Sequence, residues 1–485
     1  MTRRRLLAFA GAGTLGFGAL ATRSFDLTDL ALLFGASTYV QTFRSRPDLK
    51  PPKVAVTQRG NGVSPGLVFL SPYSGPNQGG AMIVDNQGEL VWFHPHHQKQ
   101  TTNFRIQDYR GKPVLTWWEG IITSTGHGKG DYVLLDDSYR EVARVKAGRG
   151  LQGDLHEFLL TPQQTALATM YRSVPADLSA AGGSGQDHLL DSMFQEIDVQ
   201  TGRVLLEWHS VDHVAVEESY AQFKSGPFPF DYFHINSIDV DLDGNLLVSA
   251  RNTHAVYKIN RQTGAIMWRL GGKRSDFSMG PGATFAWQHD ARRHPDGTIT
   301  IFDDGALPAV EKESRGLVLT LDEQQMVATL AREYQHPTAL LSGSQGNLQV
   351  LPTQNVLVGW GAEPYVSEFD QAGRLLFDAQ LPSSEQSYRA FRFPWSARPT
   401  EAPAMAVDRR GGDRVTVYAS WNGATEVTRW VVLGGRTPSA LKPLRSRARA
   451  GFETAIGLRT RHPYLAVRAI DSTGEALGES RTARI

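Results

Sequence analysis

The sequence contains no cysteine among its 485 residues. This absence excludes disulfides, thiolate metal sites and cysteine nucleophiles, so the fold must be stable through packing alone. The chain also lacks a strong net charge, because 50 basic side chains are balanced by 49 acidic ones, giving a formal charge of +1 at pH 7. Such a balance provides no electrostatic field for nucleic acid or for an anionic membrane surface. We therefore expect no nucleic-acid partner.

Long stretches with helical periodicity are scarce, and a repeat of short strands takes their place. The clearest copy starts at His234 and reads HINSIDVDLDGNLLVSARNTHAVYKINRQTGAIMWRLGG, with strand-length alternations separated by turn residues. A second copy starts at His289 with HDARRHPDGTITIFDDG and continues with GLVLTLDEQQMVATL. Similar closing hairpins occur near Asp85, Asp136, Asp198 and Asp370. Together they mark about six units between roughly residues 60 and 395, each of four antiparallel strands.

This repeat predicts an all-β fold with a six-bladed β-propeller over residues 51–395. Four-stranded units of about 50 residues without intervening helices are typical of propellers. A β-helix needs much shorter rungs, and a β-sandwich does not repeat one ordered four-strand unit. The first strand of each blade lines the central channel, so the residue that opens it lies at the channel mouth. His156, His234 and His289 occupy this position, and we expect their side chains to converge.

The pattern changes after the FRFPW segment that ends at Trp395. Residues 396–485 begin with a proline-rich entry and continue as short alternating strands, with tryptophans on two central ones. This part resembles a fibronectin type III or immunoglobulin-like β-sandwich. It contains no residues that suggest chemistry, and we interpret it as a packing or attachment module.

Residues 1–50 carry the signals that bear on location. TRRRLL is followed by an uncharged run from Leu6 to Thr22, with ALA at positions 19–21 as a cleavage site, which resembles a twin-arginine export signal. The alternative is a membrane anchor, because about 17 mildly apolar residues lie at the lower edge of spanning length. In both cases the basic end stays inside and the rest of the chain lies outside the cytoplasmic membrane, secreted or anchored. Residues 26–52 are expected to form a short helical linker.

Polar and aromatic residues accumulate where the predicted second strands end. SARN places Arg251 beside the top of the His234 strand, TMYR places Tyr171 and Arg172 in the preceding unit, and FDDG places Asp303 and Asp304 in the following one. Further aromatic candidates for the same rim are Trp117 and Trp118 in LTWW, with His127 soon after, and Phe285 and Trp287 just before His289. The predicted pocket is therefore both cationic and aromatic.

A pocket of this composition suits an aromatic molecule that carries an anionic group. Arginine and imidazolium bind sulfate or phosphate oxygens through charge-assisted hydrogen bonds, while aromatic rings contact the aryl part. A neutral histidine is also a nitrogen nucleophile, which permits group transfer in two steps.

Structural explanations apply to several of these residues. A single histidine that opens a propeller strand is often structural, whereas three at one register beside Arg251 favour a functional site. HPHH at residues 94–97 alternates faces in a turn, which favours a surface loop over a metal site. The aspartates of the DxDG turns are expected to cap those turns and not to bind calcium. We predict neither a metal nor a cofactor, and we assign Trp92, Trp208 and Trp268 to the core.

The phrases HINSIDVD, SARN, FAWQHDA, LTWW and YRAFRFPW, in this order of units, resemble the arylsulfotransferase family, particularly single-chain members with a C-terminal sandwich. The resemblance extends from about Gly66 to Trp395. It implies transfer of a sulfuryl group from a phenolic sulfate ester to a phenolic acceptor, by a ping-pong route through a sulfohistidine and without a nucleotide sulfate donor. Better-known periplasmic members carry the sandwich before the propeller and a disulfide, and this chain has neither, which leaves the donor and acceptor open.

The resemblance also implies roles for particular residues. His289 in QHDA corresponds to the nucleophile, His234 in HINS and His156 in DLHEF correspond to supporting histidines, and Arg251 in SARN corresponds to the arginine that holds the sulfuryl oxygens. The aromatic candidates for binding the substrate are Trp117, Trp118, Trp287, Phe285 and Tyr171.

Two other functional classes remain open on the sequence. One is a non-catalytic exported propeller whose channel binds a ligand, which would tolerate loss of His289. The other is a pyrroloquinoline quinone-type dehydrogenase, because the endings at Asp198 and Asn260 resemble its blade motif. Those enzymes usually need eight blades and a calcium-bound cofactor, and only two clean copies of the motif occur here. A bound quinone would be visible as a chromophore.

Overall fold

The computed structural model describes residues 39–75, 78–96 and 98–485. The predicted export signal, the first part of the predicted linker and His97 lie outside these ranges. Residues 39–52 contain turns and an isolated bridge between Val40 and Pro52, so the helical linker is wrong for this stretch. Three prolines between residues 47 and 52 explain the difference, since proline lacks an amide hydrogen and disfavours helical geometry in the residue before it. No helix within the described ranges has the length and hydrophobicity needed to cross a membrane.

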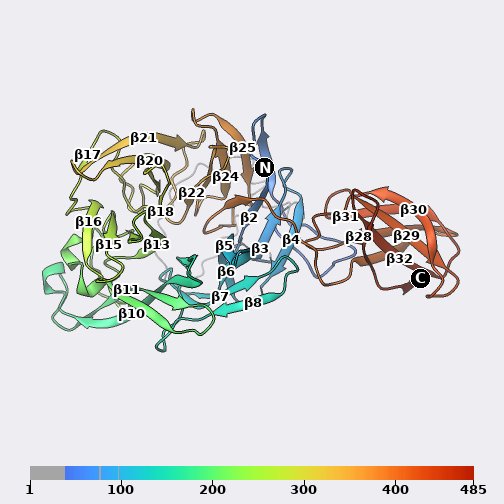
Figure 1. Cartoon of the computed structure of the whole chain (residues 1–485), viewed down its shortest axis with the longest axis horizontal. Helices are drawn as coiled ribbons and strands as arrows, with labels where there is room; N and C mark the ends of the chain where they lie inside the picture. The colour runs from blue at the N-terminus through green and yellow to red at the C-terminus, as the bar shows by residue number, and fades with distance from the viewer. Residues whose placement is uncertain (1–38, 76–77, 97) are drawn as a thin grey trace, which may run out of the picture. The chain divides into compact units, whose positions relative to one another are not determined.

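The described chain is all-β, as predicted, apart from three short 3₁₀ helices at Ser179–Ala181, Ser210–Asp212 and Val216–Glu218. Six sheets of four or five strands occupy residues 55–393 and follow one another around a common centre (Figure 1). We call this part the six-sheet region. In order from the innermost strand outward, the first three sheets are β26 (Phe391–Phe393), β2 (Leu67–Leu70), β3 (Gly80–Val84) and β4 (Leu90–Pro95); β5 (Gln100–Tyr109), β6 (Lys112–Ile122), β7 (Gly128–Leu135) and β8 (Glu141–Val145); and β9 (Phe158–Leu160), β10 (Thr165–Ala176), β11 (Asp187–Asp198) and β12 (Val204–His209).

The next three sheets continue this pattern. They are β13 (Ile235–Val240), β14 (Leu246–Ala250), β15 (Ala255–Ile259) and β16 (Ile266–Gly271); β18 (His289–Arg293), β19 (Ile299–Asp303), β20 (Arg315–Asp322), β21 (Val327–Gln335) and β17 (Ser278–Met279); and β22 (Asn347–Val350), β23 (Val356–Gly359), β24 (Tyr365–Phe369), β25 (Leu375–Gln380) and β1 (Ala55–Arg59). All neighbouring strands are antiparallel except β17 and β21.

The two ends of the six-sheet region interlock. Strand β26, from the end of the region, is the innermost strand of the sheet that contains β2, whereas β1, from its start, is the outermost strand of the sheet that contains β25. Main-chain hydrogen bonds therefore join the first and last parts of the repeat, which a linear stack of sheets would leave apart.

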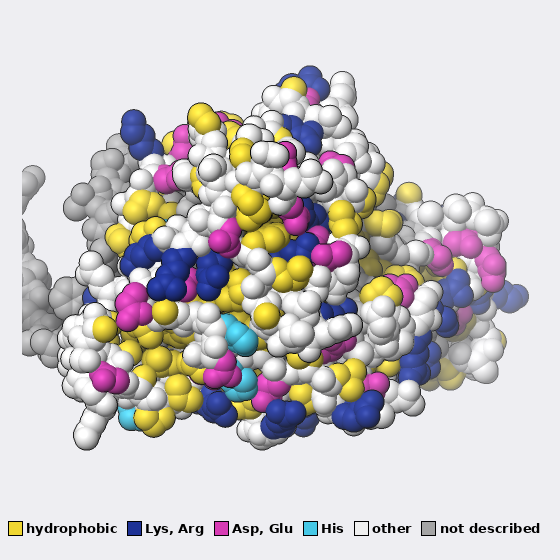
Figure 2. Space-filling model, turned by 60° about the vertical axis from the view of Figure 1, so that its left-hand side comes forward, with side chains coloured by type: hydrophobic (Ala, Val, Ile, Leu, Met, Phe, Trp, Pro, Cys, Tyr) yellow, Lys and Arg dark blue, Asp and Glu magenta, His cyan; other side chains and the backbone are white. Residues whose placement is uncertain are grey.

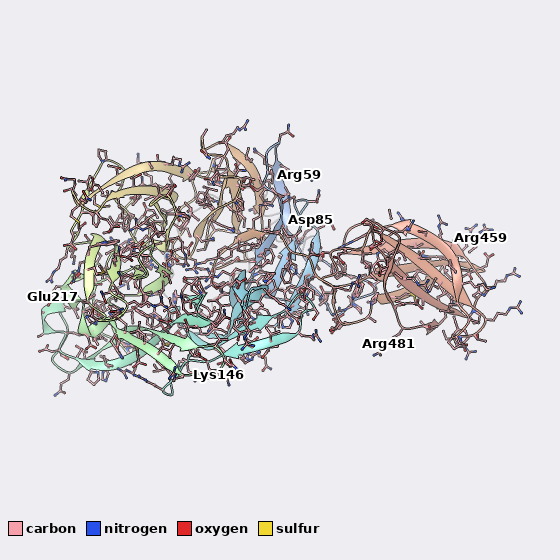
Figure 3. All side chains as sticks on the ribbon, viewed as in Figure 1. Arg59, Asp85, Lys146, Glu217, Arg459 and Arg481 are labelled. Carbon is pink, nitrogen blue, oxygen red and sulfur yellow. The ribbon has the colours of Figure 1, made fainter. Side chains whose placement is uncertain are left out.

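Hydrophobic side chains fill the space between each sheet and the next. Six clusters in the described chain each combine residues from two consecutive sheets, and one of them joins the last sheet to the first. Both faces of the middle strands are thus buried, and the sheets form a closed ring. The exposed side chains of Arg59, Lys146 and Glu217 lie on the outer side (Figure 3). Acidic and basic side chains are interspersed on the face shown in Figure 2, in keeping with the small net charge.

Aspartates cap turns in the six-sheet region, as predicted for the DxDG turn, where Asp243 accepts a hydrogen bond from the main-chain N–H of Asn245. A side-chain oxygen of Asp85, Asp136, Asp198 or Asp370 accepts a hydrogen bond from a main-chain N–H group two or three residues further on. These carboxylates cap their own turns, which is the usual role of aspartate at such positions.

Two further sheets follow the six-sheet region. They are β27 (Ala404–Arg409), β28 (Arg414–Ser420) and β31 (Glu453–Arg459); and β30 (Lys442–Ala448), β29 (Arg429–Gly435), β32 (Tyr464–Ile470) and β33 (Ala476–Glu479), with β34 (Ala483–Arg484) also paired to β32. Their inner faces share one hydrophobic cluster that includes Trp421 and Trp430. The Asn422 side chain both donates to and accepts from the main chain of Phe93 in β4, at 2.9 Å each way.

Candidate functional site

A cavity of about 300 Å³ lies at the entry to the inner strands, and the predicted site residues meet there. Its lining includes His156, Asp231, His234, Arg251, His289 and Tyr388. The three histidines and the arginine come from three consecutive sheets and are up to 133 residues apart in sequence, from 156 to 289. The structure therefore brings the four residues implied by the family resemblance into one cavity.

The main chain turns sharply where these histidines enter their strands. His289 is the first residue of β18, and His234 directly precedes β13. His234 has a φ of 58° and Asp290, next to His289, has a φ of 56°. Residues other than glycine rarely adopt such left-handed values, and when they do they often belong to functional sites. The amide of Arg251 donates to the carbonyl of His234 at 2.9 Å, which ties the two neighbouring strands together at the rim.

Each of the three histidines has a carboxylate at its Nδ1 atom. Nδ1 of His289 lies 2.7 Å from Oδ2 of Asp304, and Nδ1 of His234 lies 2.5 Å from Oδ2 of Asp231. Nδ1 of His156 is bonded to Asp154 in the same way. A carboxylate at Nδ1 fixes the proton of a neutral imidazole on that atom and leaves a lone pair on Nε2. All three rings are thus held in one tautomer and orientation.

His289 has the properties of a nitrogen nucleophile. Its ring is buried, and Nε2 accepts a hydrogen bond from the amide of Gln345 at 3.2 Å. Burial, followed by the positive charge of Arg251, lowers the pKa of His289 well below its usual value. Burial also raises the pKa of Asp304. The low pKa of His289 makes the neutral imidazole its resting form at neutral pH, and the hydrogen bond that Nε2 accepts from Gln345 indicates that the lone pair is on this atom.

Arg251 supplies a cation whose hydrogen bonds go to uncharged oxygens. Its guanidinium donates to Oδ1 of Asn252 at 3.0 Å and to the carbonyl of Gly343 at 3.1 Å, and it lies over the Trp287 ring at 4.7 Å. Burial lowers the pKa of Arg251, although an arginine remains charged under ordinary conditions. This charge is well suited to binding an anionic group.

The predicted aromatic residues have different places. Trp117 and Trp118 do not point into the cavity but lie in two separate hydrophobic clusters, on opposite faces of β6, and Nε1 of Trp118 donates to the carbonyl of Gly153 at 3.0 Å. Consecutive strand residues point to opposite faces, and both faces of β6 are covered by neighbouring sheets. We therefore correct their assignment from substrate binding to core packing. Phe285 is likewise buried in the cluster between the fourth and fifth sheets.

Two of the predicted aromatic residues lie next to the cavity residues. The Trp287 ring packs against the guanidinium of Arg251, and its Nε1 donates to the carbonyl of Pro308 at 3.0 Å. The Tyr171 ring lies 6.1 Å from the His234 ring, with its hydroxyl bonded to the carbonyl of Ile235 at 2.6 Å. Tyr73 and Tyr388 line the cavity, and sequence reasoning missed both as site residues. The Tyr388 ring lies next to the rings of His156 and His289.

The sequence matches the family model of the arylsulfotransferases (ASST) over residues 105–381, which is more than half of the chain. The chain belongs to the arylsulfotransferase family. No curated protein matches it.

Solved structures similar to this arylsulfotransferase family member share little sequence with it. A protein of unknown function from Bacteroides caccae is 13% identical with a TM-score of 0.42, covering 68% of this chain and 100% of its own. A protein from Lactobacillus plantarum is 15% identical with a TM-score of 0.36, covering 81% and 99%. A catalytically inactive virginiamycin B lyase from Staphylococcus aureus, with quinupristin, is 8% identical with a TM-score of 0.35, covering 76% and 97%. These similarities are too weak to assign a function, so the family assignment depends on the sequence match.

One group of side chains in this family member has the composition of a metal site. Among the described residues, ligand atoms of His127, Asp231 and His234 lie within 4.8 Å of one another. Two ligands of a tetrahedral ion with bonds of about 2.0–2.1 Å are about 3.3 Å apart. The 2.5 Å between Nδ1 of His234 and Oδ2 of Asp231 is much shorter, which indicates a direct hydrogen bond between these two atoms. The geometry thus favours a hydrogen-bonded group over a metal site.

A buried ionic network lies beside the cavity and centres on Glu157, the neighbour of His156. The carboxylate of Glu157 is fully buried and bonded to the guanidinium groups of Arg105, Arg292 and Arg389. Burial opposes ionisation, but the three arginines outweigh it and lower the pKa of Glu157. Arg389 is also fully buried, and its positive charge contributes to the lowered pKa of His289.

Replacing Glu157 with glutamine should destabilise the protein strongly. The change keeps the side-chain shape but leaves two buried arginines and the half-buried Arg292 without their common counter-ion, and breaking a buried ion pair typically costs about 3–5 kcal/mol. We expect a clear drop in the midpoints of thermal and urea unfolding. Glu141→Gln is the matched control, because that carboxylate is bonded to Arg144 at the surface and should contribute no more than about 1 kcal/mol. Equal midpoints for the two variants would contradict this view of the network.

Proposed function

We propose that this protein is an aryl sulfate sulfotransferase that works by a ping-pong mechanism through a sulfohistidine on His289. Family membership supports the general activity, and the cavity supports the mechanism. The observation that carries the proposal is the pairing of a neutral, carboxylate-oriented His289 with a half-buried Arg251 that is bonded to no carboxylate among the described residues. A nucleophile and an anion-binding cation are then present in one cavity.

We further infer that the scaffold is a six-bladed β-propeller followed by a β-sandwich. Six sheets with interlocked ends and six inter-sheet clusters support the first part, and the shared core of the two C-terminal sheets supports the second. In this arrangement the cavity lies where the first strands of several blades begin.

In the first half-reaction, Arg251 holds the sulfuryl oxygens of the donor. Nε2 of His289 attacks the sulfur, an N–S bond forms, and the bond between sulfur and the aryl oxygen breaks. The bonding electron pair leaves with the phenolate. The ring of His289 becomes positively charged, and the carboxylate of Asp304 at Nδ1 stabilises it. The amide of Gln345, released from Nε2, is then close enough to donate to a sulfuryl oxygen.

In the second half-reaction, a phenol attacks the sulfur of the sulfohistidine. Its proton passes to Nε2 of His234, whose lone pair is available because Asp231 holds the proton at Nδ1. The N–S bond breaks, and its electron pair returns to Nε2 of His289. The product ester leaves, and His234 releases the proton to water.

The direct test is incubation with 4-nitrophenyl sulfate and excess phenol. We expect 4-nitrophenolate release that requires phenol, together with phenyl sulfate as product. Omission of phenol should trap the intermediate and add about 80 Da to the peptide that contains His289, as expected for a covalent sulfuryl adduct. Inorganic sulfate as the only sulfur product would indicate a hydrolase, and absence of turnover with a range of aryl sulfates would contradict the proposal.

A further inference from the structure

Asp231 differs from the other two carboxylates of the site because two imidazoles share it. Its Oδ2 atom lies 2.5 Å from Nδ1 of His234 and 3.1 Å from Nε2 of His127. Its other oxygen, Oδ1, is buried and has no hydrogen-bond partner among the described residues. Both rings therefore compete for a single oxygen. By contrast, Asp304 and Asp154 are each bonded to one imidazole.

His127 lies behind the wall of the site and is not among the described residues that line the cavity. It precedes β7, its side chain is buried, and its ring lies 5.3 Å from the His234 ring. Nε2 is engaged by Asp231, and Nδ1 lies 3.1 Å from the hydroxyl of Thr125. With both nitrogens occupied by protein groups, His127 acts on the reaction only through its neighbours.

The pKa values of the two imidazoles that are bonded to Asp231 are shifted in opposite directions. Burial lowers the pKa of His127, but the hydrogen bond and charge of Asp231 outweigh it, so the pKa is raised overall. The pKa of His234 is lowered to about 4, mainly by burial. The charges of His156 and His127 lower it further, whereas Asp231 raises it. An extra proton on this pair is consequently favoured on His127 over His234, and His234 is neutral at neutral pH.

We propose that His127 is a positioning residue that shares the Asp231 carboxylate with His234 and so extends to lower pH the range in which Nε2 of His234 is free to accept the proton of the acceptor phenol. The inference rests on the proposed function. Without His127, Asp231 would interact with His234 alone, as in an ordinary Asp–His pair, and would stabilise its imidazolium form. A protonated His234 has no lone pair at Nε2 and cannot serve as the base.

The other groups that face His234 stay unchanged when His127 is replaced. The His234 ring is surrounded by His156, which has Asp154 behind it, and by Tyr171, Arg251 and His289. The Tyr171 ring packs 4.3 Å from the His127 ring, so an aromatic replacement is needed to preserve this contact.

His127→Phe removes the donor and the charge but keeps a ring, whereas His127→Gln keeps a neutral donor. In His127→Phe we expect the pKa of His234 to rise by about one pH unit or more, measured by NMR titration of histidine-labelled protein without substrate. The low-pH limb of kcat/KM for the acceptor should move to higher pH together with this pKa. The variant should therefore have about a tenfold lower kcat/KM than the wild type at pH values below the new pKa, and nearly the same kcat/KM above it. His127→Gln should show a smaller shift. The His234 signal is assigned by its disappearance in His234→Asn.

A purely structural role would give a different result. It would lower the thermal midpoint and reduce kcat equally at all pH values without moving the limb. An unchanged His234 titration in a folded His127→Phe protein would overturn the inference. If the titration shifts but the wild-type protein transfers no sulfuryl group, the coupling is correct and the proposed function is wrong, so the two failures are distinguishable.

Discussion

Replacing His289 with asparagine is expected to abolish sulfuryl transfer, lowering kcat/KM for 4-nitrophenyl sulfate by at least about 10³-fold. Asparagine retains a polar side chain that can face Asp304, but it has no nitrogen lone pair with which to attack sulfur. Residual turnover would then depend only on binding by Arg251. The measurement is initial-rate release of 4-nitrophenolate with saturating phenol, combined with mass analysis for the adduct, which should be absent from the variant.

His336→Asn is the matched control for this substitution. His336 is also buried and bonded to an aspartate, with Nε2 lying 3.2 Å from Oδ1 of Asp378, but it packs against Trp360 in the cluster between the fifth and sixth sheets and not in the cavity. The control should lower the thermal midpoint while leaving kcat/KM within about twofold, because such a change removes one buried hydrogen bond. Wild-type activity in His289→Asn would show that another group accepts the sulfuryl moiety.

The histidines of the site could be predicted because each lies at the start of the inner strand of its own sheet or within two residues before it. A position that recurs in a closed ring of sheets recurs in space, and so His156, His234 and His289 meet although they are far apart in the chain. Their carboxylates were detectable too, since Asp154 and Asp231 precede their histidines by two and three residues. A short spacing of this kind lets a side chain reach Nδ1 within the same turn.

The aromatic residues could not be placed in the same way. Trp117 and Trp118 lie on a middle strand with both faces buried, and such a strand has no alternation of polar and apolar residues to show where a side chain points. Gln345 and Tyr388 line the cavity from segments outside the regular strands, before β22 and before β26. Their proximity to His289 results from the closure of the ring between the last sheet and the first, which the repeat itself does not encode locally.

The ring closure also explains how two arginine charges reach the site although the chain is nearly neutral. Arg389, in the segment that leads into β26, is fully buried between Glu157 and Asp290, and Arg251 comes from a different sheet. Both charges lower the pKa of His289, after the larger effect of burial. Few charges are needed when they are buried, because interactions between charges are stronger inside the protein than at its surface.

Arg251→Gln is expected to lower kcat/KM for the aryl sulfate donor by about 10²- to 10³-fold, the usual range for removal of one buried group that stabilises developing charge. The kcat/KM of Arg251→Lys should lie between that of Arg251→Gln and that of the wild type. Lysine keeps the positive charge but loses the planar contact with Trp287 and the paired donors of the guanidinium. The burst of 4-nitrophenolate in the absence of phenol isolates this step. Arg172→Gln is the control, because Arg172, predicted to end the corresponding strand of the preceding sheet, lies within β10, is half exposed and faces Asp191.

The same substitution has a second consequence that a loss of binding alone would not produce. Removal of the Arg251 charge takes away one cause of the depressed pKa of His289, so that pKa should rise while staying below its usual value because burial persists. His289 attacks only in its neutral form, and activity is lost as pH falls through its pKa. The acidic limb of the donor kcat/KM should therefore move to higher pH in Arg251→Gln and stay in place in Arg172→Gln. A donor kcat/KM within threefold of wild type, with an unmoved limb, would exclude Arg251 from contact with the sulfuryl group.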